Sequence, residues 1–236
     1  MNIALILSGG CGTRAGTDIP KQYMYVNGKP VIAYSIERLF AHGEVDCVQI
    51  VATAQWHECI REWLKAAGAE MKFKGFSVPG TNRQLSILHG LEDIRGFAAD
   101  SDYVLIHDAA RPMLSTKLIS DCLNAAKGHE GVLPVLPMKD TVYGSKNGKT
   151  VTGLLKREEI YAGQAPEVFQ LGPYYEANRR LLPDQILEIN GSTEPAVLAG
   201  MDVIMIPGEE GNFKITTKND LEKFRQMMRF EDGDRC

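Results

Sequence analysis

Short apolar runs rich in β-branched residues alternate along this chain with segments of helical periodicity. The runs predict buried strands, and the segments between them predict helices that cover a sheet on both faces. This alternation is typical of an α/β protein with a mainly parallel sheet. We expect strands at residues 3–7, 47–53, 103–107, 132–136 and 203–206, and helices at residues 31–41, 56–67, 85–94, 117–126 and 221–228.

Size and composition narrow the class of protein. A chain of 236 residues with 44% hydrophobic content can bury a sizeable core, which predicts a single domain over residues 1–236. The net charge of -4 gives no reason to expect a nucleic-acid partner. No apolar run reaches the roughly 18 residues of a membrane span, and the first run has no basic leader, so we expect a cytoplasmic protein without a membrane partner. The five cysteines form no CxxC pair, which argues against a metal site.

A glycine-rich loop follows the first predicted strand. Glycines let the backbone turn tightly and bring N–H groups against a phosphate, while spaced Arg and Lys side chains add positive charge. The spacing fits neither the P-loop nor the dinucleotide fingerprint, which disfavours an ATPase or a dehydrogenase. The loop predicts a triphosphate cradle made by Gly9, Gly10, Gly12, Thr13, Arg14 and, further on, Lys21.

Two later segments place charged side chains where strands end. Asp108 and Arg111 close the third predicted strand, and the pair could hold a substrate hydroxyl and a phosphate or form a buried ion pair that closes a loop. His107 is better explained as a locally packed strand residue than as a catalytic base. Lys214 precedes a helix predicted to be capped by Thr217, and it could reach the same phosphates as Lys21.

Two further segments complete the pattern. Residues 79–86 form a loop that enters a helix, a natural place for backbone contacts to a base or an anion. Residues 140–161 interrupt the alternation, and the turn signal at residues 146–149 predicts a projecting β-hairpin. A hairpin of this size is marginal alone in water, so we expect it to pack on a second subunit.

In this order and spacing, these segments resemble the 2-C-methyl-D-erythritol 4-phosphate cytidylyltransferase family, with the ribitol-5-phosphate cytidylyltransferases as near relatives. The likeness covers nearly the whole chain. Its specific parts are GGxGTR with PKQ, the RxxS loop, HDAARP, DT followed by the hairpin and Arg157, GQxP, and NxKIT with DL. The resemblance implies a Rossmann-like nucleotidyltransferase fold, transfer of CMP from CTP to a polyol phosphate, and a homodimer whose arms reach the partner's site.

The resemblance also implies a role for each matching residue. Arg14, Lys21 and Lys214 would act on the CTP phosphates as the catalytic cations, with Mg2+ bound mainly through the triphosphate. The nucleotide would contact the glycine-rich loop and Ala109 and, around the base, Gly80, Arg83 and Ser86. The acceptor would contact Asp108, Arg111, Thr141 and Arg157, the last from the other subunit.

Two stretches depart from the family pattern on the acceptor side. The family usually reads GQTPQ where this chain has residues 163–167, with Ala165 and Glu167, and it carries a Thr-Asp acidic stretch where this chain has residues 190–195. HDAARP favours methylerythritol phosphate as acceptor, and ribitol 5-phosphate or another polyol phosphate is the alternative. Two other classes stay open: a UTP- or GTP-dependent sugar-phosphate enzyme, and a nucleotide sensor without catalytic activity.

Overall fold

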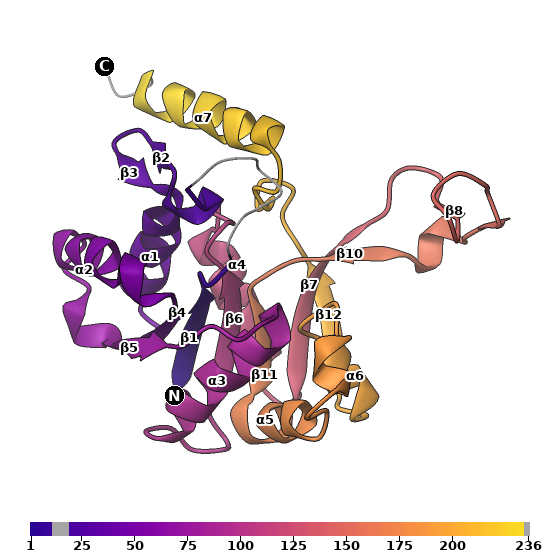
Figure 1. The fold of residues 1–236 in the computed structure, drawn as a ribbon, viewed down its shortest axis with the longest axis horizontal. Coiled ribbons are helices and arrows are strands. Elements are labelled where there is room, and N and C mark those ends of the chain that lie inside the picture. The colour runs from indigo at the N-terminus through magenta and orange to yellow at the C-terminus, as the bar shows by residue number, and fades with distance from the viewer. Residues whose placement is uncertain (11–18, 234–236) are drawn as a thin grey trace.

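A mixed, mostly parallel sheet forms the centre of the molecule, which confirms the predicted α/β class. The computed structural model describes residues 1–10 and 19–233, with side chains described as far as residue 229. The sheet has eight strands in the order β10-β7-β11-β6-β1-β4-β5, and β12 pairs with β7 (Figure 1). The strands are β1 Asn2–Leu7, β4 Cys47–Val51, β5 Phe73–Ser77, β6 Tyr103–Asp108, β7 Gly131–Pro137, β10 Tyr161–Gly163, β11 Glu167–Gln170 and β12 Val203–Pro207.

The order of the strands reverses beside β1. The chain passes from β1 to β4 and β5 on one side, and β6 then returns to pair with β1 on the other, in parallel in every case. Such a switch point leaves a crevice beyond the carboxyl ends of the two central strands, where open α/β sheets bind their ligands. The loops after β1 and β6 therefore meet at this edge.

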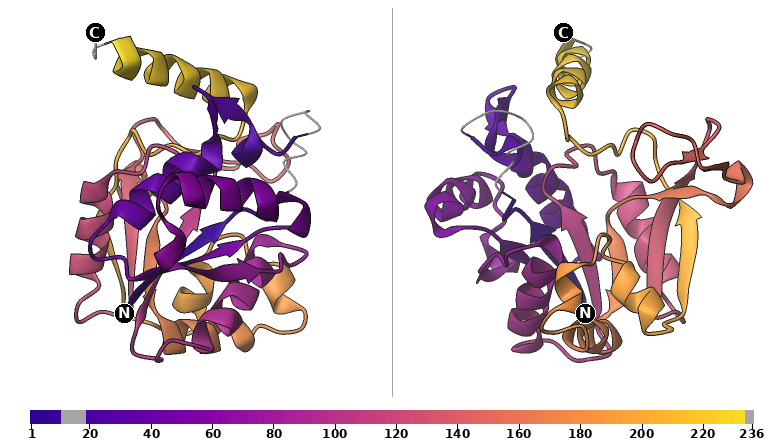
Figure 2. Two further views of the ribbon diagram at one scale, coloured as in Figure 1. Left: turned by 90° about the vertical axis from the view of Figure 1, so that its left-hand side faces the viewer. Right: turned by 45° about the vertical axis from the view of Figure 1, so that its right-hand side comes forward.

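Helices cover both faces of the sheet (Figures 1 and 2). One face buries Ile6, Ile50 and Leu105 against α1 Val31–Ala41, α2 His57–Ala66 and α4 Thr116–Ala125. The other face buries Ile3, Leu5 and Ile106 against α3 Arg83–Arg95, α5 Leu171–Arg179 and α6 Glu194–Leu198. Alternate residues of β1 serve the two faces, because successive side chains of a strand point in opposite directions. The strands are buried on both sides as a result, which explains their nearly continuous apolar runs.

Polar side chains set where the helices near this edge begin. The Asn82 side chain accepts a hydrogen bond from Leu85 N at 2.8 Å and starts α3. Ser115 Oγ accepts from Leu118 N at 2.9 Å and starts α4. At α7 Lys218–Gly233, Thr217 Oγ1 accepts from Asp220 N at 3.2 Å and the Asp220 carboxylate accepts in return from Thr217 N at 2.7 Å. This reciprocal cap confirms the expected role of Thr217.

The β10 and β11 strands lie one after the other along the same edge of β7. Tyr161 pairs with Pro137 at one end of β7, and Phe169 pairs with Gly131 at the other end. Both are antiparallel to β7, and they are the antiparallel members of the sheet. Residues 164–166 join them, with a cis peptide bond between Ala165 and Pro166.

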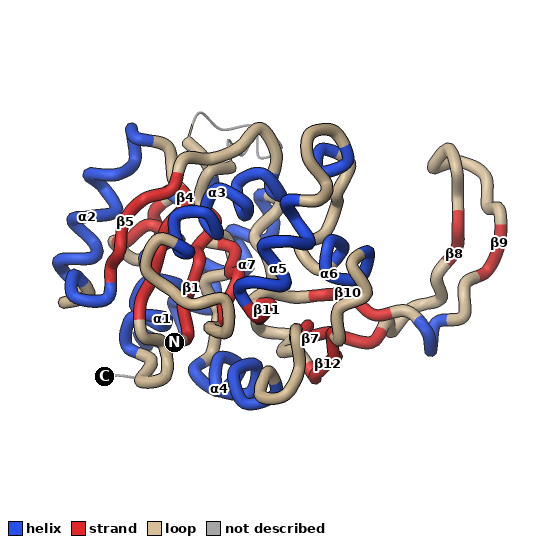
Figure 3. Tube along the Cα trace, turned by 90° about the horizontal axis from the view of Figure 1, so that it is seen from below, coloured by secondary structure: helices blue, strands red, loops and turns tan. Residues whose placement is uncertain are grey.

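An arm made by residues 140–161 projects from the body of the molecule (Figures 1 and 3). It carries the antiparallel pair β8 Tyr143–Gly144 and β9 Gly153–Leu154, followed by the 3-10 helix η5 Arg157–Glu159. The pairing lies further from the turn than the sequence suggests, because residues 145–152 form a wider loop. Gly148 has a φ of +69° in this loop, and the Asn147 side chain accepts from Lys149 N and Thr150 N at 2.9 Å each.

The remaining elements are small. A hairpin, β2 Tyr25–Val26 with β3 Lys29–Pro30, packs with α1 and α7 around Tyr34 and Phe224. The other 3-10 helices within residues 1–10 and 19–233 are η2 Lys21–Tyr23, η3 Ala54–Trp56, η4 Glu70–Lys72 and η6 Gln185–Leu187. Among the described residues, no helix combines the length and the apolar character needed to cross a membrane.

Candidate active site

A cavity of about 500 Å3 opens at the carboxyl ends of β1 and β6. It gathers side chains and glycines from the loop after β1, the start of α3, the end of β6 and the segment before α7. Eight residues proposed from the sequence line it: Gly9, Gly10, Lys21, Gly80, Arg83, Ser86, Asp108 and Lys214. Gln22, Asn82, Ala110 and Thr216 also line it, and the sequence analysis did not single them out.

The loop after β1 is held in place by residues that follow it. The buried Gln22 amide donates to the carbonyl oxygens of Ser8, at 2.9 Å, and Gly10, at 2.7 Å. A side chain at Gly9 would meet Pro79 at 2.6 Å, so the loop after β1 touches the loop after β5 there. Gly12, Thr13 and Arg14, the remaining predicted members of the phosphate cradle, lie outside the described residues.

The loop that enters α3 is closed on itself around Gly80. A Cβ added to Gly80 would lie 2.3 Å from Leu85 Cβ, so only glycine fits there. Gly80 N donates to Ser86 Oγ at 3.0 Å, and Ser86 Oγ donates to Asn82 O at 2.8 Å. The Ser86 hydroxyl thus fixes the loop shape, and the loop presents its backbone to the cavity.

Asp108 is a buried carboxylate shared by three cations. Arg83 Nη2 lies 3.1 Å from Asp108 Oδ1, while Lys214 Nζ and Arg111 Nε lie 3.0 Å and 3.5 Å from Oδ2. Burial alone would raise the pKa of Asp108, but the charges of Arg83, Lys214 and Arg111 outweigh it and hold the pKa far below the usual range. Asp108 therefore stays ionised, and the three cations are held together beside the cavity.

Arg111 contacts Asp108 but does not line the cavity. Its Nη1 donates to the Asn212 carbonyl at 2.7 Å, which ties the end of β6 to the segment before α7. The contact with Asp108 is the loop-closing ion pair considered from the sequence, enlarged by Arg83 and Lys214. His107, which directly precedes Asp108, is buried, and its Nε2 lies 3.2 Å from Arg111 O. Burial lowers the pKa of His107 to about 4, so its ring is neutral at pH 7 and packs locally, as the sequence suggested.

The two stretches that depart from the family pattern meet behind Arg83. Arg83 Nη1 donates to Ser192 Oγ at 2.5 Å, and Ser192 Oγ donates to the Glu167 carboxylate. Tyr174 Oη donates to Ser192 O at 2.7 Å and holds the segment from the other side. Burial raises the pKa of Glu167, while the charge of Arg83 opposes that rise. Sequence reasoning noted both departures, but nothing in the sequence showed that they touch.

Besides Arg111, three predicted site residues among those described do not line the cavity. Ala109 is buried, and its N–H donates to Leu7 O at 3.1 Å. Thr141 and Arg157 are exposed on the arm, where Arg157 Nη1 donates to Lys139 O at 3.0 Å. The arm extends away from the body of the molecule (Figure 3), and neither residue lines the cavity that contains Asp108.

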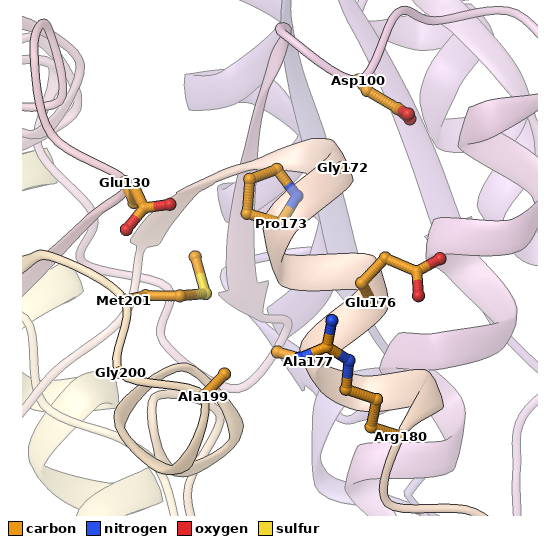
Figure 4. Close-up of a pocket in the computed structure, with 10 residues that line it drawn as sticks. All are labelled: Asp100, Glu130, Gly172, Pro173, Glu176, Ala177, Arg180, Ala199, Gly200 and Met201. Atoms are coloured by element: carbon orange, nitrogen blue, oxygen red, sulfur yellow. The ribbon is translucent and has the colours of Figure 1, made fainter.

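A second hollow of about 450 Å3 lies near the amino ends of β6, β7 and β12. Asp100, Glu130 and Met201 line it, and they precede β6, β7 and β12 respectively. The Glu176 and Arg180 side chains reach it from the α5 segment (Figure 4). None of the described residues there belongs to a predicted motif. No group of three or more His, Cys, Asp or Glu side chains among the described residues could hold a metal ion.

Comparison with known proteins decides the family. The model of the family named "IspD: 2-C-methyl-D-erythritol 4-phosphate cytidylyltransferase" matches residues 2–229. The chain belongs to this family. The bifunctional enzyme IspD/IspF of Maricaulis maris is 35% identical over 231 residues, which are 95% of this chain and 57% of that protein. The chain thus spans a little over half the length of such bifunctional relatives.

Relatives of similar length have two different names. The 2-C-methyl-D-erythritol 4-phosphate cytidylyltransferase of Roseobacter denitrificans is 32% identical over 230 residues, covering 98% of both chains. The ribitol-5-phosphate cytidylyltransferase of Lactiplantibacillus plantarum is 31% identical over 224 residues, covering 94% of this chain and 95% of that one.

Solved structures confirm the fold expected for the IspD family. The 2-C-methyl-D-erythritol 4-phosphate cytidylyltransferase of Francisella tularensis superposes with a TM-score of 0.80 at 24% identity, over 95% of this chain and 98% of that one. The 4-diphosphocytidyl-2C-methyl-D-erythritol synthase of Anaerococcus prevotii superposes with a TM-score of 0.82 at 23% identity, over 97% and 96%.

Proposed function

We propose that this chain is a cytidylyltransferase that moves CMP from CTP to the phosphate of 2-C-methyl-D-erythritol 4-phosphate and releases pyrophosphate. The observation that carries this proposal is the cavity that joins a glycine-rich loop, Lys21 and the cation cluster on Asp108, in a chain of the IspD family. Residues 1–236 would work as one catalytic unit with residues 140–161 as its arm.

The chemistry asks for charge neutralisation more than for a base. An oxygen of the acceptor phosphate attacks the α-phosphorus of CTP, a new P–O bond forms, and the bond to the bridging oxygen breaks. Pyrophosphate leaves with that electron pair. The acceptor is already an anion, so orientation and electrostatic stabilisation carry most of the rate. His107, neutral and buried, is outside this scheme.

The cations divide between the two ends of the reaction. We propose that Arg14, Lys21 and Lys214 contact the CTP phosphates, and that Gly80 and Ser86 shape the loop around the cytosine. Arg83, grouped with the base from the sequence, points its guanidinium at Asp108, so we assign it to the acceptor end. Asp108 completes that end, with Thr141 and Arg157 supplied by a partner subunit. Arg111, expected from the resemblance to contact the acceptor, supports it through its ion pair with Asp108.

Mg2+ would bind mainly through the triphosphate. The carboxylate at the described cavity, Asp108, is enclosed by cations and is a poor ligand for a second cation. Mg2+ commonly keeps several waters and takes its other ligands from substrate phosphates. When bound there, it would withdraw charge from the phosphates beside Lys21 and Lys214.

The acceptor has two candidates, because a relative over 94% of this chain is named for ribitol 5-phosphate. Pyrophosphate release by the full chain with CTP and Mg2+, offering each polyol phosphate in parallel, separates them. Faster release with methylerythritol phosphate supports the proposal, and faster release with ribitol 5-phosphate reassigns the acceptor. Release with UTP or GTP in place of CTP would contradict the cytidylyl assignment. Tight CTP binding with no release over a panel of acceptors would indicate a sensor.

A homodimer is part of the proposal. The arm exposes apolar side chains, among them Tyr143, Val151 and Leu154, and a two-stranded hairpin rarely stands alone in water. Near the foot of the arm, Tyr161 and Met205 are exposed on one face of the sheet. On the same face α6 covers the neighbouring Val203, but it leaves Tyr161 and Met205 open. A second copy would bury both surfaces, since a two-fold axis brings each arm onto the other body.

Complementation between two inactive variants tests this arrangement. Lys21→Ala removes a phosphate contact from its own site, whereas Arg157→Ala would remove an acceptor contact from the partner's site. In dimers formed by co-expression of the two variants, one site of each mixed dimer is intact, and about a quarter of the wild-type turnover returns. Return of no activity in mixed dimers, shown by mass spectrometry to form, would place Arg157 in its own subunit's site.

A further inference from the structure

Glu167 is a buried carboxylate that the proposed reaction does not use. It is the first residue of β11 and is 9% exposed, and it does not line the cavity. Its carboxylate accepts a hydrogen bond from Ser192 Oγ, and Ser192 is 1% exposed. Burying an ionisable side chain lowers the stability of the fold unless the side chain is hydrogen-bonded. The contact with Ser192 is therefore needed for stability, for function, or for both.

Ser192 connects Glu167 to the cavity wall. Its Oγ accepts from Arg83 Nη1 at 2.5 Å, and the same guanidinium reaches Asp108 Oδ1 through Nε at 3.3 Å and Nη2 at 3.1 Å. The planar guanidinium is therefore held from two sides, by Asp108 in front and by Ser192 behind. Such a fork loses its orientation when one side is released.

Asp108 depends on that orientation. One of its oxygens is occupied by Arg83, which leaves the other for Lys214 at 3.0 Å and Arg111 at 3.5 Å. If Arg83 rotates away, Asp108 Oδ1 loses its partner while Oδ2 keeps Lys214 and Arg111. The carboxylate is then free to rotate so that Oδ1 approaches one of these two cations. The position of Asp108 at the cavity therefore depends on a chain of contacts that begins at Glu167.

We propose that Glu167 is a positioning residue that acts through the Ser192 hydroxyl to hold Arg83 against Asp108, and so sets the geometry of the acceptor end of the pocket. The inference rests on the proposed function in that the affected substrate is the polyol phosphate. The hydrogen bond from Ser192 to an ionised carboxylate is stronger than one to a neutral group. The acceptor oxygen that Glu167 offers to the Ser192 hydroxyl is therefore the feature that matters, and Glu167→Gln tests whether its charge contributes.

A double-mutant cycle measures the coupling. Glu167→Gln and Ser192→Ala should each raise the KM for the polyol phosphate by roughly tenfold, the effect of losing one charge-assisted hydrogen bond. The KM for CTP should change by less than about twofold. Because Glu167 acts through Ser192, the double variant should stay within about twofold of Ser192→Ala alone. Ser192→Thr keeps a hydroxyl and should restore most of the acceptor affinity.

Glu188→Gln is the matched control, because it removes an exposed carboxylate four positions before Ser192 and should leave both KM values unchanged. Additive effects of Glu167→Gln and Ser192→Ala, or an equal rise in both KM values, would overturn the proposal. Should Glu167→Gln fail to fold, Ser192→Ala and Ser192→Thr still give the contrast.

A second readout does not depend on activity. Arg83 Nε–H hydrogen exchange, followed by NMR and assigned by its loss in Arg83→Lys, should accelerate at least roughly tenfold in Ser192→Ala and Glu167→Gln. If the wild type releases no pyrophosphate while Arg83 exchange still accelerates, the proposed function fails and the positioning role stands. Unchanged exchange in both variants would refute the positioning role whatever the activity.

Discussion

Lys214 Nζ lies 3.0 Å from Asp108 Oδ2, so two residues far apart in the sequence form an ion pair at the carboxyl edge of the sheet. Lys214 is about one-third exposed, and its ammonium is held beside the cavity before any phosphate arrives. A bound triphosphate would find this cation already placed, which lowers the entropy lost in reaching the transition state. The pair thus preorganises the charge that the proposed reaction needs.

Lys214→Ala should reduce turnover by about a hundredfold, the loss typical of one preorganised contact to developing charge. Arg14→Ala and Lys21→Ala should have effects of similar size for the same reason. Pyrophosphate release at saturating substrates measures the change. Lys218→Ala, at the exposed start of α7, is the control, and near-normal rates in the three test variants would contradict the assignment.

Asp108→Asn should destabilise the fold because it leaves Arg83, Arg111 and Lys214 without their shared anion. Removing one partner of a buried ion pair costs about 3 kcal/mol or more in unfolding free energy. Urea unfolding followed by circular dichroism measures this loss. Asp100→Asn breaks an exposed pair with Arg95 and should lower the unfolding free energy far less, because solvent screens that pair. Equal effects of the two changes would mean that the cluster contributes little.

His107 should make stability depend on pH. Burial lowers its pKa to about 4 from the usual 6.5, so the unfolded chain binds the proton more readily between these values. The stabilisation is present above pH 6.5 and is lost as the pH falls toward 4, amounting to about 3 kcal/mol. His107→Gln should flatten that part of the curve of unfolding free energy against pH. His89→Gln, which lies outside the cluster, serves as the comparison, and identical slopes in wild type and His107→Gln would rule the effect out.

Gly80→Ala should disturb the loop before α3. The added Cβ would lie 2.3 Å from Leu85 Cβ and 2.7 Å from the Leu85 carbonyl carbon, so the backbone must shift. Overpacking of this kind typically costs about 1–3 kcal/mol in unfolding free energy. Calorimetric CTP titration should show weaker binding as well. Gly43→Ala, where nothing lies within 4 Å of the added Cβ, is the matched control and should bind CTP normally.

The core strands and their helices were predictable because burial on both faces gives them continuous apolar runs. Residues 3–7, 103–107 and 132–136 lie within β1, β6 and β7. The strands and helices that we did not predict contain residues that usually disfavour such elements. The β5 strand contains Gly75 at a φ of +150°, and α5 has Gly172 and Pro173 in its first turn, where proline is tolerated but reads as a break.

The cavity was predictable in part for a similar reason. Parallel strands end at one edge, so Gly9, Asp108 and the segment before α7 were expected to meet, and they do. The contact between Glu167 and Ser192 was not predictable, because it depends on how the α5 and α6 segments pack against β11. The partner of the arm lies beyond what one chain's sequence or structure describes.

The foot of the arm and the carboxylate behind Arg83 share one stretch of backbone. The chain leaves the arm at β10 and reaches Glu167 within residues 161–167. Tyr161 at the exposed foot and Glu167 behind Arg83 belong to the same short segment. Substitutions at the two positions therefore lie close together in the sequence when members of the family diverge. Subunit contact and acceptor preference would then be inherited together, and exchanging residues 161–167 between relatives should carry both traits at once.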